Sequence, residues 1–394
     1  INDINTPLEN SKLKIIDGKG GYITPGLIDM HVHMYEQGAY VLTLSHGVTH
    51  VRVMNGVPKQ LEWRDNIASG IDIGSTSTVS SPIISGYKGA YLQHFVNSEQ
   101  EAIDAAHTYK SQGYDLIKAY GNLSEDSLLG VLKESERLNI PVAKHGPHAS
   151  GSMPISRLSG IQSFEHVEDI FQGPLDHKFT PEKLPKIIEE IKETNVPVTP
   201  TLNIYYQLTK ISQEKEAYLA NTSPEYTPDI ITFETSTNQV KRWLDSSEKM
   251  ASYNQKKFDF LQDITKRLND NDVPLLVGSD SGVLLSPHGI ATHNEMRLMK
   301  MSGLTSFEVL QAATLNPAKA LGLNNKLGKL AKGYQADFIY TIDNPVTNLS
   351  VLESSEAVIK NGFWYNRATL NSMREKAIES RSLLDEFFVL FEGL

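Results

Sequence analysis

The chain is 394 residues long and contains no cysteine. Disulfide bonds and thiolate ligands to a metal ion are therefore excluded. Long hydrophobic runs are also missing: no apolar stretch reaches the ~18 residues of a membrane span. Basic residues are outnumbered, with 37 lysines and arginines against 47 aspartates and glutamates and a net charge of -10. An acidic chain without a basic cluster is not expected to bind nucleic acid.

Short apolar runs alternate with helical patterns along most of the chain. One helical stretch begins at Ser98, where Glu101 completes a capping box, and similar patterns follow Ser124 and cover 180–193. The apolar runs predict eight strands, at 27–33, 48–54, 76–84, 116–120, 142–145, 163–166, 198–202 and 275–280. This alternation predicts an α/β fold, a parallel (β/α)8 barrel of the TIM type, whose functional groups gather at the C-terminal ends of the strands.

His31 and His33 close the first of these runs. Side chains two apart on a strand point to the same face, so the two imidazoles aim at one place. Imidazole is a common ligand for zinc and related transition metals. In a chain with twelve histidines such a pair also arises by chance, so the pair alone does not identify a metal site.

Four more polar residues fall at or near the ends of predicted strands: Lys118, His145, His166 and Asp280. Each has an ordinary explanation, as a surface lysine, a core histidine or a helix N-cap. Chance would scatter such residues over both ends of the barrel. Their common position at one rim therefore favours a metal centre.

At this point the chain resembles the amidohydrolase superfamily. Residues 24–33 are similar to the opening motif of that superfamily, and 278–281 to its aspartate motif on the eighth strand. Residues 312–323, Gly328 and 332–337 resemble the segment that returns the chain from the barrel to a small β-sandwich. The match runs from about residue 15 to about residue 365. The context of Lys118, residues 114–120, is similar to the Xaa-Pro dipeptidase (prolidase)-like and imidazolonepropionase-like branch.

The resemblance implies a centre of two divalent metal ions, zinc before other transition metals, with six ligands: His31, His33, Lys118, His145, His166 and Asp280. The first two histidines and the aspartate would hold the more buried ion, and the other two histidines the more exposed one. The lysine would bridge them as an N-carboxylated lysine, since an ammonium has no lone pair. If the lysine is not carboxylated, the implied site is mononuclear, as in the deaminases of the superfamily.

The implied reaction is hydrolysis of a carbon–nitrogen bond in a small molecule, by a hydroxide that bridges the metals, with Asp280 as the proton shuttle. We expect a dipeptide or an N-acyl amino acid as the substrate. The alternatives are cyclic amide hydrolysis of the imidazolonepropionase type and deamination at one metal. A non-catalytic scaffold is the third class, but every expected ligand position is filled.

Four residues are candidates for substrate contact: Tyr120, His148, Tyr205 and His288. Tyr120 should share the face of Lys118, where its hydroxyl could assist catalysis, although a packed aromatic side chain is an equal alternative. The long connection at 203–271, with helical patterns at 210–219 and 240–268, is expected to set specificity. Three carboxylates could orient the metal-binding histidines: Asp29, Glu165 and Glu295.

The ends of the chain are expected to form the second unit. We predict a barrel over 23–326 and a β-sandwich from 1–22 and 327–394, with strands at 13–16, 337–341, 357–360 and 363–366, then a C-terminal helix at 370–388. Only 24 residues precede Pro25, so we expect a truncated or processed N-terminal part. Localisation is therefore open between the cytoplasm and export, and the sequence leaves homo-oligomerisation undecided.

Overall fold

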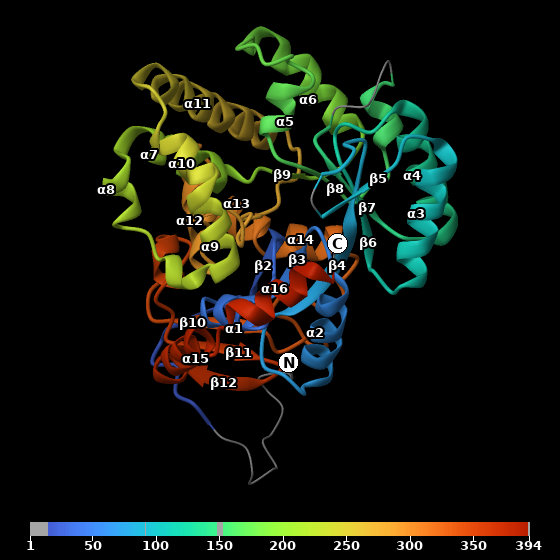
Figure 1. Ribbon diagram of the computed structural model, residues 1–394. Helices are drawn as coiled ribbons and strands as arrows, with labels where there is room; N and C mark the ends of the chain where they lie inside the picture. Colours follow the sequence, from blue (N-terminus) through green and yellow to red (C-terminus); the bar gives the residue numbers. More distant parts are fainter. Residues whose placement is uncertain (1–14, 91, 148–152, 393–394) are drawn as a thin grey trace.

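The computed structural model describes residues 15–90, 92–147 and 153–392. Its centre is a parallel sheet with the strand order β2-β3-β4-β6-β7-β8-β9, which curves into a barrel (Figure 1). The short strand β5, which the sequence did not predict, pairs with β4. The strands are β2 Leu27–Val32, β3 Val48–Val53, β4 Thr76–Ser85, β5 Gln93–Phe95, β6 Leu116–Ala119, β7 Val142–His145, β8 Ser163–Glu165 and β9 Val198–Thr199.

The eighth predicted strand, 275–280, closes the ring through hydrogen bonds on both sides. Met30 N donates to Val277 O at 2.8 Å, and Leu276 N donates to Val198 O at 2.9 Å. Only isolated bridges form here, between Val32 and Ser281 and between Val198 and Leu275. The segment therefore completes the predicted barrel without forming a regular ladder.

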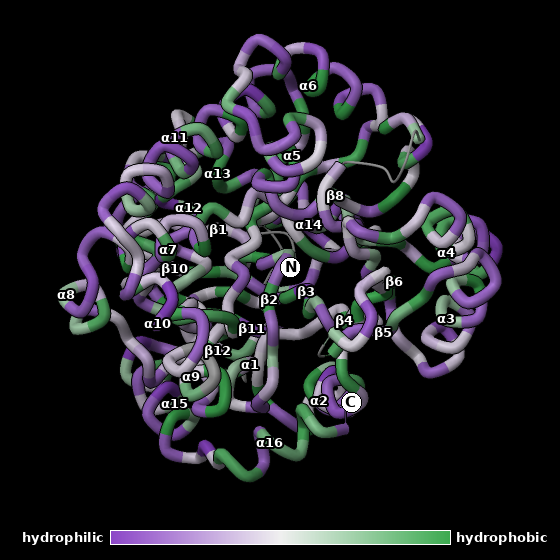
Figure 2. Tube along the Cα trace, turned by 45° about the horizontal axis from the view of Figure 1, so that its top comes forward, coloured by the Kyte–Doolittle hydropathy of each residue, from purple (hydrophilic) through white to green (hydrophobic). Residues whose placement is uncertain are grey.

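The inner strands are buried on both faces because helices cover the outside. Every residue of β2 and β3 is buried, as expected for parallel strands between a barrel interior and a helical layer. In Figure 2 outer helices such as α6 carry long hydrophilic stretches. The predicted caps are present: Ser98 Oγ accepts from Glu101 N, and Ser124 Oγ from Ser127 N, each at 3.2 Å.

The helices that cover the barrel follow the strands in the order that the sequence predicts. In the segment predicted to be helical at 180–193, a short 3-10 turn, Pro181–Lys183, comes before the helix itself. The covering helices are α1 Gly38–Ser45, α2 Pro58–Ser69, α3 Glu99–Ser111, α4 Glu125–Leu138, α5 Glu168–Gln172, α6 Leu184–Glu193, α12 Ile290–Met301, α13 Ser306–Ala312 and α14 Leu315–Ala320.

The seventh strand is shorter than predicted. We expected 198–202, but β9 ends at Thr199 and Leu202 already belongs to a helix. Pro200 has no N–H to offer a neighbouring strand, and Thr201 adopts a left-handed φ of 53°. These two residues end the strand and turn the chain onto the rim.

The connection between the seventh and eighth strands is a helical layer at the upper left of Figure 1. Two of its helices pack together through polar contacts, such as the 3.2 Å bond from Asn254 Nδ2 to Ser212 Oγ. The sequence predicted two helical stretches here, whereas the structure has five helices: α7 Leu202–Glu214, α8 Glu216–Leu219, α9 Asp229–Thr237, α10 Gln239–Leu244 and α11 Glu248–Asp270.

A four-stranded antiparallel sheet lies below the barrel in Figure 1, with the order β1-β10-β11-β12. Its strands are β1 Tyr22–Pro25, β10 Phe338–Thr341, β11 Ala357–Lys360 and β12 Phe363–Asn366. The three C-terminal strands match their predictions. Of the strand expected at 13–16, residues 13 and 14 lie outside the described residues, and Ile15 and Ile16 are not in a strand. We keep the division into barrel and second unit as a proposal.

The single C-terminal helix predicted at 370–388 is wrong, because two helices form: α15 Arg367–Glu379 and α16 Leu383–Phe391. The break falls at 380–382, where Ser382 Oγ caps α16 by accepting from Asp385 N at 3.3 Å. Arg381 leaves the helical path and pairs with Glu36 on the barrel. The tertiary ion pair and the new cap together explain the break.

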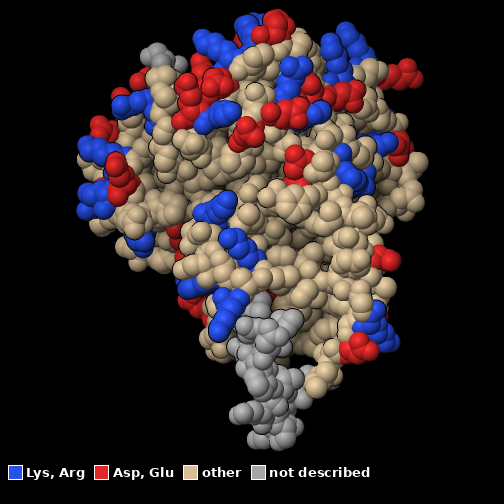
Figure 3. Space-filling model, turned by 180° about the vertical axis from the view of Figure 1, so that it is seen from behind, with Lys and Arg blue, Asp and Glu red and all other residues tan. Residues whose placement is uncertain are grey.

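The surface is mixed in charge. On the face shown in Figure 3, acidic and basic side chains are interspersed over the upper part, and uncharged residues cover much of the middle. Among the helices that the structure describes, none combines the length and apolar character needed to cross a membrane.

Candidate metal centre

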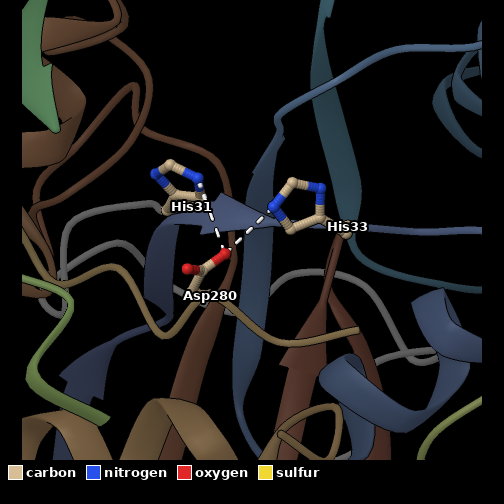
Figure 4. Close-up of side chains that lie close together, drawn as sticks. All are labelled: His31, His33 and Asp280. Carbon is tan, nitrogen blue, oxygen red and sulfur yellow. Dashed lines mark hydrogen bonds and ion pairs between the residues drawn. The ribbon is translucent and has the colours of Figure 1, made fainter. Parts of the chain in front are cut away.

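Two histidines from the end of the first barrel strand meet an aspartate from the eighth segment (Figure 4). His33 Nε2 lies 2.9 Å from Asp280 Oδ1, and His31 Nε2 lies 3.6 Å from the same oxygen. One ligand atom from each residue falls within 4.8 Å of the others, and all three side chains are buried. Two imidazoles and a carboxylate in this arrangement suit a divalent transition metal.

Backbone geometry brings the aspartate to this place. A Cβ atom on Gly278 would lie 2.2 Å from Thr199 Cγ2 and 2.9 Å from His31 Cβ, so only glycine allows the segment to approach β2 and β9 this closely. Asp280 and His166 then adopt left-handed φ angles of 53° and 66°. Non-glycine residues pay about 1 kcal/mol or more for such angles, and they concentrate at functional sites.

Two further histidines stand beside this group. The ring centroids of His145 and His166 are 4.2 Å apart, and that of His166 is 4.7 Å from the His31 ring. His145 Nδ1 pairs with Asp169, and His166 Nδ1 lies 2.6 Å from Thr201 Oγ1. Each Nδ1 is therefore engaged, which leaves Nε2 of both rings to bind a metal ion.

Burial favours the neutral form of three of these histidines, His31, His145 and His166. Burial lowers the pKa of His31 to about 4 and holds the pKa values of His145 and His166 well below the usual range. Burial opposes ionisation of Asp280, but His31 and His33 hold its pKa below the usual value. Neutral imidazoles and an ionised carboxylate are the protonation states that bind metal.

Behind His31 lies a buried ion pair that fixes its ring. His31 Nδ1 lies 2.8 Å from Glu165 Oε2, and Arg52 Nη2 donates to Glu165 Oε1 at 2.6 Å. Burial raises the pKa of Glu165, but Arg52 and His31 outweigh this and hold it well below the usual range. The guanidinium also donates to Met30 O and to Ser163 Oγ, at 2.8 and 2.7 Å. A carboxylate behind a metal-binding imidazole orients the ring and raises its basicity.

Lys118 lines the same cavity and is 2% exposed. Its Nζ has no hydrogen-bond partner among the described residues. Burial lowers the pKa of the amine to about 8. A buried ammonium group without hydrogen-bond partners is unfavourable. The neutral amine is the form that can react with carbon dioxide.

The centre opens into a cavity of about 470 Å³ at the C-terminal ends of the strands. Tyr120 lines it together with Lys118, as predicted from their spacing, and its ring lies 4.2 Å from that of His145. Tyr205 on α7 also lines it, and its hydroxyl donates to Glu168. Both tyrosines stand where a substrate would enter, as expected for a TIM-type barrel.

Of the other two predicted substrate contacts, one lies outside the described residues and one lies away from the cavity lining. His148 lies outside the described residues. His288 is fully buried, with Nδ1 3.2 Å from Ser281 Oγ, and it is not among the described residues that line the cavity. The loop after 280 turns this ring into the protein instead of toward the mouth.

The three carboxylates expected to orient histidine rings have different tasks. Glu165 contacts His31, as described above. Asp29 accepts from Ser279 N at 3.0 Å and from Thr292 Oγ1 at 2.6 Å, so it fixes the backbone of the eighth segment. Glu295 accepts from Asn203 N at 2.7 Å and fixes the start of α7.

Five residues that surround the site did not emerge from the sequence: Arg52, Glu168, Asp169, Thr201 and Lys257. The first had a visible signal, as a single charge inside the apolar run 48–53. Glu168 and Asp169 lie in the short helix α5, Thr201 lies just before α7 and Lys257 lies on α11, and spacing does not determine which of these side chains meet.

Comparison with known proteins finds relatives in sequence and solved structures of similar fold. An imidazolonepropionase of Idiomarina loihiensis is 23% identical over 364 residues, covering 82% of this chain and 78% of the relative. A bottromycin amidohydrolase superposes with a TM-score of 0.75 at 18% identity, over 93% of this chain and 82% of that one. A Xaa-Pro dipeptidase with methionine bound in its active site gives 0.65 at 21% identity, over 88% and 87%.

The family model described as the amidohydrolase family matches residues 22–364. This range contains the barrel and nearly all of the antiparallel sheet. Members of the family generally use metal ions. The chain therefore belongs to the amidohydrolase family and is a hydrolase that acts on carbon–nitrogen bonds.

Proposed function

We propose that the protein hydrolyses the amide bond of a dipeptide or an N-acyl amino acid at a centre of two divalent ions, zinc before other transition metals. The ligands would be His31, His33, Lys118 as its carbamate, His145, His166 and Asp280. The observation that carries this proposal is the buried Lys118 amine, which has no hydrogen-bond partner in the described structure and shares a cavity with five metal-binding groups. A carbamate would give this position two oxygen ligands.

The residues of the chain then have defined tasks. When bound, the two ions would acidify the attacking water and polarise the substrate carbonyl. Asp280, whose Oδ1 faces His31 and His33, accepts the proton of that water and delivers it to the leaving nitrogen. The Tyr120 hydroxyl donates to the carbonyl oxygen as negative charge develops there. The water oxygen ends in the new carboxyl group, and the released amine gains a proton.

A small amide substrate suits the cavity. Its volume of about 470 Å³ lies within the ~300–1,000 Å³ of small-molecule sites. The likeness to the Xaa-Pro dipeptidase supports a dipeptide, and the likeness to the bottromycin amidohydrolase supports amide chemistry.

The second candidate is hydrolysis of a cyclic amide, or deamination, at one ion. Two observations favour it: curated relatives of this chain are imidazolonepropionases, and only His31, His33 and Asp280 converge tightly among the described residues. The product distinguishes the candidates. Release of a free amino acid supports the first, and ring opening or release of ammonia supports the second.

The test combines a substrate screen with metal counting. The metal-loaded protein should release an amino acid from members of a dipeptide and N-acyl amino acid library. Lys118→Ala should lose about one metal equivalent and nearly all activity, whereas Lys118→Glu, which restores a carboxylate, should keep both ions. Full metal occupancy in Lys118→Ala would contradict the bridging role.

A further inference from the structure

Glu168 faces the substrate cavity from the first turn of α5. Its Oε1 accepts from Lys257 Nζ at 2.7 Å, and its Oε2 accepts from the Tyr205 hydroxyl. Lys257 also lies over the Tyr205 ring, 5.3 Å from its centroid. The Glu168 side chain is 13% exposed. Two donors from the helical layer thus hold this carboxylate in one orientation at the cavity wall.

The charges of the described cavity lining single out Glu168. The other two carboxylates, Asp169 and Asp280, pair with histidines of the centre. The lining cation is Lys118, which the proposed centre uses, and Lys257 stands behind Glu168 without lining the cavity. Among the described residues that line the cavity, Glu168 is therefore the charged side chain that neither binds a metal ion in the proposed centre nor pairs with one of its histidines.

A carboxylate has about four lone-pair positions, and the two donors leave room for more. A dipeptide carries its α-ammonium on the carbon next to the carbonyl that is cleaved, so it brings a charged donor to the cavity wall. An N-acyl amino acid brings only hydrogen at that place. An N-acyl amino acid would therefore displace water from the carboxylate without donating a hydrogen bond in return, and this desolvation is unfavourable.

We propose that Glu168 binds a substrate ammonium group and that the enzyme therefore prefers dipeptides with a free N-terminal amine over N-acyl amino acids. This inference rests on the proposed amide hydrolysis at the same site and narrows its substrate class. Tyr205 and Lys257 are positioning residues in this arrangement. Lys257 also neutralises part of the negative charge that attracts the ammonium.

The test uses substrate pairs that differ only in this group, such as alanyl-leucine and N-propionyl-leucine. With metal-loaded enzyme we expect kcat/KM to favour alanyl-leucine about 10- to 100-fold, the value of a charged hydrogen bond. In Glu168→Gln the preference should fall toward unity through loss on alanyl-leucine, at unchanged metal content. In Lys257→Met the preference should rise, because the carboxylate loses its competing cation.

The opposite effects of the two variants separate recognition from a structural role. If the residues were only structural, both variants would lower kcat/KM for the two substrates alike. Glu190→Gln, at a half-exposed position on α6, is the matched control and should keep the wild-type ratio. Equal rates on both members of the pairs in wild type, or an unchanged ratio in Glu168→Gln, would overturn the inference while the proposed function stands. If no pair is cleaved at all, the proposed function fails and the inference falls with it.

Discussion

Arg52 is a fully buried arginine inside the barrel whose charge is matched by Glu165. A buried ion pair is a weak source of stability, because desolvation offsets its attraction. Here the pair continues to His31 and orients its ring, so we assign it a positioning task. The same logic applies to Asp169 behind His145 and to Thr201 beside His166.

This assignment gives a prediction for Glu165. Glu165→Gln keeps the shape but removes the charge that Arg52 and His31 share, so metal affinity should fall about 10- to 100-fold. Competition with a chelator of known affinity measures the change. The control variant Glu190→Gln should bind metal like wild type, and unchanged affinity in Glu165→Gln would reject the positioning role.

The residues proposed to bind metal could be predicted from the sequence because each lies at or near a strand end. The H-x-H spacing places His31 and His33 on one face, and His145, His166 and Asp280 end predicted strands. Glu168 and Lys257 could not be found this way. They are 89 positions apart and meet only because α11 folds back over α5.

At the scale of elements, arginine side chains tie the C-terminal helices to the barrel. Arg381, in the break between α15 and α16, donates to Glu36 at 2.7 Å and to the carbonyl of Glu225 in the helical layer. Both charged side chains of the pair are buried. Glu386 on α16 accepts from Ile230 N at 2.8 Å, so α16 also holds the start of α9.

Breaking this tie should destabilise the protein strongly. Arg381→Ala leaves Glu36 buried without its partner, and the free energy of unfolding should fall by about 3 kcal/mol. Replacing both residues, with Glu36→Gln and Arg381→Met, should recover part of the loss. Arg267→Ala, which breaks a half-exposed pair with Asp263, should cost under about 1 kcal/mol. Denaturant unfolding measures all three, and equal losses at both sites would contradict the assignment.

The positions of helices and strands could be predicted where residues close in sequence determine them. Ser98 and Ser124 mark helix starts, and the strand spans follow their apolar runs closely. The break at 380–382 was not predictable, because the residue that causes it pairs with Glu36, 345 positions earlier. In 202–270 the prediction merged α7 with α8 and α10 with α11, and it missed α9, for a similar reason: the ends of these helices depend on contacts with one another.

At the scale of the whole molecule, buried neutral histidines link stability to pH. His46, His50 and His293 lie away from the cavity lining, and burial lowers their pKa values to about 3, 3 and 4. His50 is hydrogen-bonded through Nδ1 to Thr76 Oγ1 and through Nε2 to Thr78 Oγ1, each at 3.0 Å. In the unfolded chain the same groups bind protons near pH 6.5.

Stability should therefore be full above about pH 6.5 and should fall as the pH drops toward 4, because the unfolded state then binds more protons. Each of these histidines adds up to about 1.4 kcal/mol per pH unit to the slope. The unfolding free energy of wild type and of His50→Gln should be measured across this pH range in the same metal state. Their slopes against pH should differ by the contribution of about one proton. Parallel curves would contradict the prediction.

The barrel itself was predictable from the alternation of strands and helices, because parallel β/α units have few ways to close. The sheet formed by β1 and the C-terminal strands was predictable on its C-terminal side only. Its first strand lies at 22–25, next to the first barrel strand, where a single apolar run conceals the change of sheet.

The central claim is that the strand ends hold two divalent ions. Anomalous diffraction from crystals of the natively purified protein tests it directly. We predict one peak bounded by His31, His33 and Asp280 and a second beside His145 and His166, joined by extra density on Lys118. A map without an anomalous peak in this cavity, from protein that still hydrolyses its substrate, would contradict the account.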